Sequence, residues 1–207
     1  FIVLVSLGGF IFEHYGISWL ISIGLILLVC LGICSLFLQY NHHQHAAQQS
    51  QDTPEFSQLI RNPNIILFLS AILLLQVSHG PYYSFFVLYL RDAGFSESFA
   101  GLQIGLGVLA EVAVFTITAR LLRRFGAKQL LLISMLLSAL RWLLMPYVID
   151  SWVALSFNQL FHAASFGSAH AGAMAMLNHW FCGNTRGRGQ ALYASISFGG
   201  GGAIGAL

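Results

Sequence analysis

The chain alternates between long runs of apolar residues and short polar connectors. The apolar segments are Phe1–Phe12, Ile17–Leu38, Ile65–Leu90, Ser98–Ala119, Gln129–Ile149 and Val153–Met176, and another begins near Gln190. Most of them approach the roughly 20 residues that an α-helix needs to cross a bilayer. Membrane β-strands need only about 10 residues and alternate apolar with polar positions, whereas these runs are continuous. The pattern predicts an all-α membrane protein, and its first and last runs look like parts of longer spans.

The charges in the connectors alternate from one side to the other. One set of connectors holds seven Lys and Arg residues, namely Arg61, Arg120, Arg123, Arg124, Lys128, Arg186 and Arg188. The opposite set holds Arg91 together with the acidic residues Glu13, Asp92, Glu97 and Asp150. Cytoplasmic loops of membrane proteins carry an excess of Lys and Arg. The first set of connectors is therefore predicted to be cytoplasmic.

Composition supports the membrane interpretation and excludes other classes. Hydrophobic residues make up 57% of the chain and charged residues 8%, against roughly 25% charged in soluble domains. A net charge of +2 gives no reason to expect a nucleic-acid partner. The three cysteines, Cys30, Cys34 and Cys182, lack zinc-site spacing, and no disulfide framework is expected.

The stretch 39–62 is the only long polar segment, and it contains the run Asn41-His42-His43-Gln44-His45. Histidine-rich tracts sometimes bind metal. A composition rich in Gln and His with few apolar residues is, however, more typical of a solvated linker. We interpret this stretch as a cytoplasmic loop between two helical halves and predict no metal site.

Two ionisable residues, Glu111 and Arg141, lie in the middle of apolar segments. A charge at the centre of a bilayer span costs about 3 kcal/mol on insertion scales, and such residues usually face a bundle interior or a watery cavity. They therefore mark a substrate or proton path, although a purely structural ion pair between two helices is an alternative. The sequence therefore predicts that the chain is part of a transporter.

Further polar side chains fall at a similar depth in the neighbouring spans. Gln76, His79 and Tyr83 share one helical face, next to Gly80-Pro81, which is expected to interrupt the helix. Gln159 and His162 are three residues apart in the last complete segment. From a rise of 1.5 Å per residue, His79, Glu111, Arg141 and His162 lie about 12 to 21 Å from the cytoplasmic ends of their helices. We expect one central polar layer.

These groups suggest a mechanism of proton coupling. A carboxyl in an apolar cavity can hold a proton at physiological pH, and a nearby guanidinium opposes this. Rocking of the bundle that changes the distance between Glu111 and Arg141 would then tie proton release to the side that is open. Alternatively, Arg141 binds a substrate carboxylate and competes with Glu111 for the same cation.

Several motifs carry a resemblance to a known family. They are Gln76-Val77-Ser78-His79-Gly80-Pro81-Tyr82-Tyr83, Ala93-Gly94-Phe95-Ser96, Gly107-Val108-Leu109-Ala110-Glu111-Val112, Arg123-Arg124, Leu131-Leu132-Ile133-Ser134, Arg141-Trp142 and His162. Together they resemble the phenylpropionate permease-like branch of the major facilitator superfamily, which is similar to the lactose permease and nucleoside–proton symporter families.

The resemblance implies a monomeric carrier of twelve helices in two halves that works by alternating access. Residues 1–38 would end the first half, 39–63 would form the central loop, and 64–207 would be a second half cut off in its fifth helix. Lactose-permease-like carriers use a carboxylate, an Arg and a His where this chain has Glu111, Arg141 and His162. They also have an acidic residue one turn after that His, where this chain has Ser165.

The leading interpretation is proton-coupled symport of a small organic solute, such as an aromatic carboxylate, across the bacterial inner membrane. The alternatives are a nucleoside or sugar symporter, a metal-ion carrier and an intramembrane enzyme. No His-Glu-x-x-His helix or nucleophile elbow is present, so no catalytic site is expected, and the proton replaces any cofactor.

The predicted site residues form three groups. The proton-coupling residues are Glu111, His162 and Arg141, and the substrate-binding residues are Gln76, His79, Tyr83, Arg141 and Gln159. The predicted cytoplasmic gating loop contains Arg120, Arg123, Arg124 and Lys128.

Overall fold

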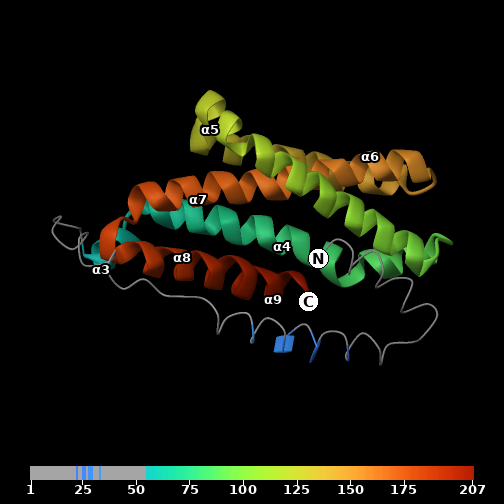
Figure 1. Cartoon of the computed structure of the whole chain (residues 1–207), viewed down its shortest axis with the longest axis horizontal. Helices are drawn as coiled ribbons and strands as arrows, with labels where there is room; N and C mark the ends of the chain where they lie inside the picture. The colour runs from blue at the N-terminus through green and yellow to red at the C-terminus, as the bar shows by residue number, and fades with distance from the viewer. Residues whose placement is uncertain (1–21, 23–24, 27, 30–32, 34–54) are drawn as a thin grey trace.

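The computed structural model of the chain describes residues 22, 25–26, 28–29, 33 and 55–207 (Figure 1). The predicted segment 1–12, most of the segment 17–38 and the histidine-rich run 41–45 lie outside the described residues. The end of the predicted central loop is described, and it contains a short helix, α3 (Phe56–Ile60).

Helix α4 (Pro63–Asp92) is the first described helix long enough to cross a membrane. Its start is fixed by Asn62, whose side chain accepts a hydrogen bond from the Asn64 backbone at 2.9 Å, and by a proline in the first turn, where no N–H is needed. It ends before Gly94, which has φ +87°. These bounds enclose the predicted span 65–90.

The interruption expected at Gly80-Pro81 is absent, because α4 continues through Pro81. A proline inside a helix removes one hydrogen bond and leaves the carbonyl four residues earlier without its partner. That carbonyl belongs to Val77, and it faces the backbone of Gly205, where an added Cβ would lie 2.5 Å from the Val77 oxygen. Close packing by a neighbouring helix thus covers the exposed carbonyl.

Helix α5 (Glu97–Val148) contains two spans joined at Gly126, which has the non-helical angles φ 76° and ψ 160°. Ala100 and Met145 belong to one buried cluster, although in a straight helix they would be about 68 Å apart. The chain therefore doubles back at Gly126, and Figure 1 shows α5 rising to this turn and returning towards α6.

The predicted connector 120–128 is wrong in extent, because helix continues on both sides of Gly126. Its basic residues Arg120, Arg123, Arg124 and Lys128 lie on the two helix ends. A positive φ is accessible to glycine without the Cβ clash that other residues suffer, so one residue suffices for the reversal.

Two more spans complete the described part. The first joins α6 (Trp152–His162), the π-helical segment η3 (Ala163–Gly167) and α7 (Ser168–Trp180). A 3-10 turn, η4 (Gly183–Thr185), leads to the second, which joins α8 (Arg186–Ala194), the π-helical segment η5 (Ser195–Gly201) and α9 (Gly202–Gly205). Figure 1 shows this last span beside α4.

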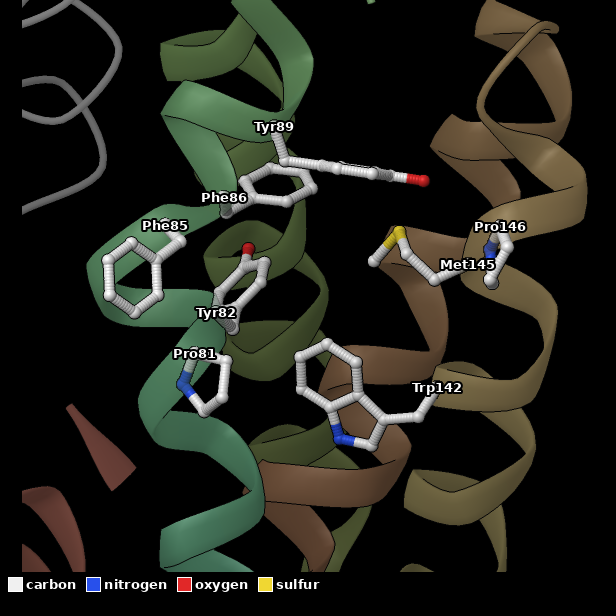
Figure 2. A pocket seen from close by; sticks show the side chains of 8 residues that line it. All are labelled: Pro81, Tyr82, Phe85, Phe86, Tyr89, Trp142, Met145 and Pro146. Atoms are coloured by element: carbon white, nitrogen blue, oxygen red, sulfur yellow. The ribbon is translucent and has the colours of Figure 1, made fainter. Parts of the chain in front are cut away.

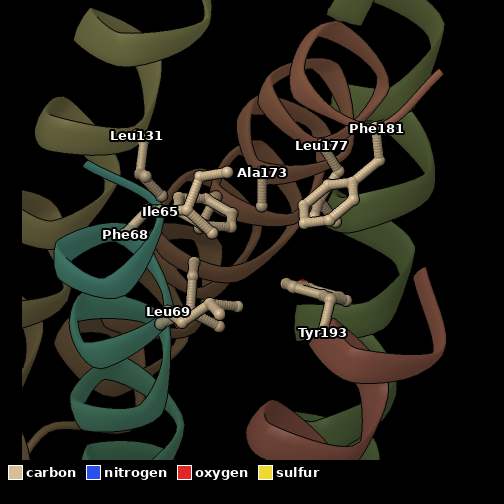
Figure 3. Packing of buried hydrophobic residues seen from close by; sticks show 10 residues of the cluster. Ile65, Phe68, Leu69, Leu131, Ala173, Leu177, Phe181 and Tyr193 are labelled. Atoms are coloured by element: carbon tan, nitrogen blue, oxygen red, sulfur yellow. The ribbon is translucent and has the colours of Figure 1, made fainter. Parts of the chain in front are cut away.

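Two apolar clusters occupy opposite ends of the bundle. One contains Ile65, Phe68 and Leu69 of α4 together with Leu131, Ala173, Leu177, Phe181 and Tyr193 (Figure 3). The other contains Tyr82, Phe86, Leu90, Ala100, Met145 and Leu155. The part of α4 between the clusters carries buried Gln76 and His79. A polar layer therefore separates two apolar ones, as the depths along the sequence predict.

The outer surface of the bundle is apolar. Leu67, Leu74, Leu136, Leu143 and Phe157 are each more than 60% exposed. Both α4 and α5 are long and apolar enough to cross a membrane, and an exposed apolar surface of this extent is typical of a face that contacts lipid or other protein segments.

The basic residues gather at the end of the bundle where α4 begins. Lys128 lines a cavity together with Asn64 and Trp180, and the guanidinium carbon of Arg188 lies 4.1 Å from the ring centre of Phe56. Phe56 in turn lies 5.8 Å from the ring of Phe181. Helix α3 is thus held against the α7–α8 turn at the end predicted to be cytoplasmic.

The contact between α4 and the last span is expected to be sensitive to a single methyl group. Gly205→Ala places a Cβ against the Val77 carbonyl and the Gly80 backbone, so the helices must separate, at a cost of about 1–3 kcal/mol. We expect a lower thermal unfolding temperature of the full-length protein in detergent. Gly202→Ala is the control, because a Cβ there meets nothing within 4 Å and alanine favours helix. Equal unfolding temperatures for the two variants would contradict the packing.

Candidate functional site

The candidate site is the polar layer between the two apolar clusters. Its buried polar residues come from α4, both spans of α5, α6 and η3: Gln76, His79, Gln103, Ser134, Ser138, Arg141, Asn158, Gln159, His162 and Ser165. Burying such groups costs free energy unless hydrogen bonds replace those made to water. A dense layer of this kind inside a membrane bundle indicates function.

Glu111 and His162 form a close pair at the centre of the layer, with 2.9 Å between the carboxyl Oε1 and the imidazole Nε2. Two glycines lie beside this pair. A Cβ on Gly107 would lie 3.4 Å from the His162 ring, and a Cβ on Gly167 would lie 3.5 Å from the Glu111 side chain. The π-helical segment begins immediately after His162, and such segments are frequent at functional sites.

Arg141 is fully buried, with 0% of its surface exposed. Its guanidinium carbon lies 4.3 Å from the ring centre of Tyr82 and 5.0 Å from that of Trp142. None of its three side-chain nitrogens has a hydrogen-bond partner among the described residues. The direct Glu111–Arg141 pair considered from the sequence is not formed, since in the described part of the chain Glu111 pairs with His162.

His79 is also fully buried, and its ring position is fixed by the backbone. Its Nδ1 lies 2.8 Å from the Leu75 carbonyl oxygen, which only accepts, so Nδ1 carries the proton and donates. In the neutral ring the other nitrogen, Nε2, is then an acceptor, and it has no partner. The His79 ring centre lies 5.7 Å from that of His162.

Tyr82 links three members of the layer. Its hydroxyl donates to Gln159 Oε1 at 3.1 Å, its ring covers Arg141, and its ring centre lies 5.1 Å from that of His162. Tyr82 is not among the site residues predicted from the sequence, where it is interpreted mainly as a packing aromatic with solute stacking as the alternative. The i, i+1 doublet with Tyr83 gave no signal for its role, because adjacent helix residues point in different directions.

Tyr83 and Phe166 form the exposed side of the same cluster. Tyr83 is 55% exposed, and its ring centre lies 6.4 Å from that of His162 and 6.3 Å from that of Phe166. Phe166 stacks on His162 at 5.4 Å with an interplanar angle of 11°. Phe166 was missed from sequence, although its i+4 spacing from His162 was a usable signal.

Gln76 lies apart from this cluster although it shares a face of α4 with His79. A Cβ on Gly201 would lie 2.7 Å from the Gln76 Cβ, so Gln76 packs against the last span. There it lines a small cavity with His170 and Tyr193, whose Nδ1 and hydroxyl oxygen are 3.0 Å apart.

A common pattern runs through several side chains of the layer that carry two polar atoms. One of these atoms is bonded to the protein, and the other has no hydrogen-bond partner in the part of the chain that the structure describes. Gln103 donates from Nε2 to the Ser156 hydroxyl at 2.8 Å, and Asn158 donates from Nδ2 to the Arg141 carbonyl at 3.4 Å. Their free ends are Gln103 Oε1 and Asn158 Oδ1, and the corresponding free atoms of Gln159 and His162 are Nε2 and Nδ1. Each side chain is therefore oriented while keeping one polar atom available.

An apolar cavity of about 290 Å³ adjoins the layer on the side of Tyr82 and Trp142. Figure 2 shows these two rings between Pro81 on α4 and Pro146 on α5, with Phe85, Phe86, Tyr89 and Met145 completing the lining. The rings that contact Arg141 thus also form part of the cavity wall.

Comparisons with known proteins agree with this architecture. A family model described as the MFS_1 like family matches residues 1–207. The chain belongs to this family. It is a member of the major facilitator superfamily of integral membrane proteins, with the phenylpropionate permease-like character indicated by its motifs.

A probable 3-phenylpropionic acid transporter of Escherichia coli (strain K12) is 32% identical to the chain over 182 residues, which cover 85% of this chain and 47% of that protein. The chain therefore spans about half the length of this relative. No solved structure is significantly similar to the chain.

The buried guanidinium is expected to lower stability in the absence of a bound anion. Replacing a buried charge that lacks partners by an apolar residue of similar size often stabilises a protein. We therefore expect Arg141→Met to raise the thermal unfolding temperature of the full-length protein by a few degrees. Arg91→Met, at an exposed position, is the control and is expected to change it little. A clear fall for Arg141→Met would show that the charge is satisfied in the unliganded protein.

Proposed function

We propose that the full-length protein is a proton-coupled symporter for a small aromatic carboxylate in the bacterial inner membrane. The observation that carries this proposal is the buried layer in which an acid–histidine pair lies close to a guanidinium that has no carboxylate partner among the described residues. The family membership and the name of the relative support it. The proton serves as the coupling ion, and we propose that a single chain acts without a cofactor.

The Glu111–His162 pair is the proposed proton site. A carboxylate and an imidazole 2.9 Å apart can share one proton, and either group can release it when its surroundings change. Arg141 is near this pair, because the Tyr82 ring contacts both its guanidinium, at 4.3 Å, and the His162 ring, at 5.1 Å. Alternating access that alters these distances would change the proton affinity of the pair.

Arg141 and Gln159 form the proposed carboxylate site. The guanidinium provides up to five N–H donors in a planar fork that suits a carboxylate, and Gln159 Nε2 is a further free donor. The exposed ring of Tyr83 and the ring of His79 are the proposed contacts for an aromatic solute. We propose no role for Gln76 in this site, because it packs against the last span.

A nucleoside or sugar is the second candidate solute, and one observation favours it. The free atoms Gln103 Oε1, Asn158 Oδ1 and His79 Nε2 are acceptors, which suit hydroxyl groups. Ser165, which replaces the acidic residue of the sugar carriers, donates to the His162 carbonyl at 3.2 Å and adds no negative charge. The unpaired guanidinium makes the carboxylate the better match.

Uptake into proteoliposomes tests the proton site. For the full-length protein we expect an inward proton gradient to drive accumulation of labelled phenylpropionate. Glu111→Gln removes the titrating group, so accumulation above equilibrium should be lost while exchange without a gradient persists. Glu55→Gln, at an exposed position, is the control. Gradient-driven accumulation by Glu111→Gln would exclude this residue as the proton site, and competition by nucleosides or sugars but not by phenylpropionate would favour the second candidate.

Equilibrium binding tests the carboxylate site. Arg141→Gln is expected to weaken phenylpropionate binding by about 10- to 100-fold, because charge-assisted hydrogen bonds contribute roughly 1.5–3 kcal/mol. Arg91→Gln provides the matched loss of charge at an exposed position. An unchanged dissociation constant for Arg141→Gln would remove Arg141 from the site.

A further inference from the structure

Two buried side chains of the polar layer that both contact Tyr82 have donors without a hydrogen-bond partner among the described residues. In Arg141 these donors are Nε, Nη1 and Nη2, and in Gln159 the donor is Nε2. Both side chains are 0% exposed. Free buried donors are costly, and the group that best satisfies several of them together is an oxyanion.

Tyr82 contacts Arg141 through its ring and Gln159 through its hydroxyl. Its ring lies against the guanidinium, 4.3 Å from the centre of the ring to the guanidinium carbon. Its hydroxyl donates to Gln159 Oε1 at 3.1 Å. The ring thus stabilises the charge of Arg141, while the hydroxyl is bonded to the oxygen end of the Gln159 amide and leaves the nitrogen end without a bond to Tyr82.

An amide that can rotate offers either a donor or an acceptor, because its two ends have nearly the same shape. The Tyr82 hydroxyl occupies the acceptor end and leaves the donor end free. Without that hydroxyl, Gln159 Oε1 would lose its partner, and the amide would turn this oxygen towards the guanidinium or towards a donor on the solute. The polarity of the site would then change without a change in its size.

We propose that Tyr82 is a positioning residue that sets the selectivity of the site for carboxylates over carboxamides by orienting Gln159. This inference rests on the proposed function, in which Arg141 and Gln159 bind the solute carboxylate. A carboxamide of the same shape presents an NH2 donor where the carboxylate presents an acceptor, so it meets the Gln159 Nε2 donor unfavourably. Sites built to hydrogen-bond one group reject an analogue that leaves buried polar groups unpaired.

The test is a comparison of 3-phenylpropionate with 3-phenylpropionamide in equilibrium binding to the full-length protein in detergent. Tyr82→Phe keeps the ring over Arg141 and removes only the hydroxyl, so the fold should be preserved. We expect the preference for the acid over the amide to fall at least tenfold, with weaker binding of the acid and equal or stronger binding of the amide. Tyr89→Phe, a hydroxyl loss on the same helix at a half-exposed position, should keep the wild-type preference.

A second variant shows whether Tyr82 acts through Gln159. In a Gln159→Leu background the amide is gone, so adding Tyr82→Phe should change the preference less than twofold. An undiminished preference in Tyr82→Phe, or an equal loss in both backgrounds, would overturn the inference and leave the proposed function intact. A wild-type protein that binds neither compound would overturn both.

Discussion

The structure depends on holding a guanidinium and its polar neighbours inside an apolar bundle. Arg141 lies between two apolar clusters, one at each end of the helices. Lipid offers no hydrogen bonds, so each polar group in this layer must be bonded to the protein or reserved for a ligand. The arrangement of the spans follows from this need, since the polar layer is formed only when α4, both spans of α5 and α6 meet at the same depth.

Small residues make that meeting possible. Helices in lipid gain little from apolar burial and associate through close packing and hydrogen bonds. Gly205 allows the last span to lie against the Val77 carbonyl that Pro81 leaves free, and Gly107 and Gly167 lie beside the Glu111–His162 pair. Glycine is thus found both beside the site and at a close contact between spans.

The sequence was sufficient for features that depend on composition along the chain. The span of α4, the basic end of the bundle and the common depth of His79, Glu111, Arg141 and His162 all follow from hydropathy, charge and helical rise. Features that depend on contacts between spans could not be predicted. The reversal at Gly126 looked like an ordinary connector, since a single glycine among helix-forming residues does not show its backbone angles. From the sequence Arg141 was considered as the partner of Glu111, and His162 lies at a similar depth, so depth alone could not show that the structure pairs Glu111 with His162. The hydrogen bond from Tyr82 to Gln159 likewise depends on how two helices meet.

Side chains with one bonded and one unbonded polar atom explain how the polar layer can be rigid and still bind a solute. Five side chains of the layer each have one polar atom bonded to the protein and one without a partner among the described residues: His79, Gln103, Asn158, Gln159 and His162. The bonded atoms fix the direction of the free ones, so little conformational entropy is lost when a solute binds, as preorganised sites require. The free atoms include both donors and acceptors, but the formal charge among them belongs to Arg141. Shape and hydroxyl groups can therefore adjust the choice of solute, whereas the guanidinium determines that an anion satisfies the layer best.

Since His162 Nε2 is bound to Glu111, a proton gained by His162 appears at Nδ1 and turns that free acceptor into a donor. In the proposed function, protonation and solute binding would act on the same set of atoms, and this shared set would be a physical basis for coupling them.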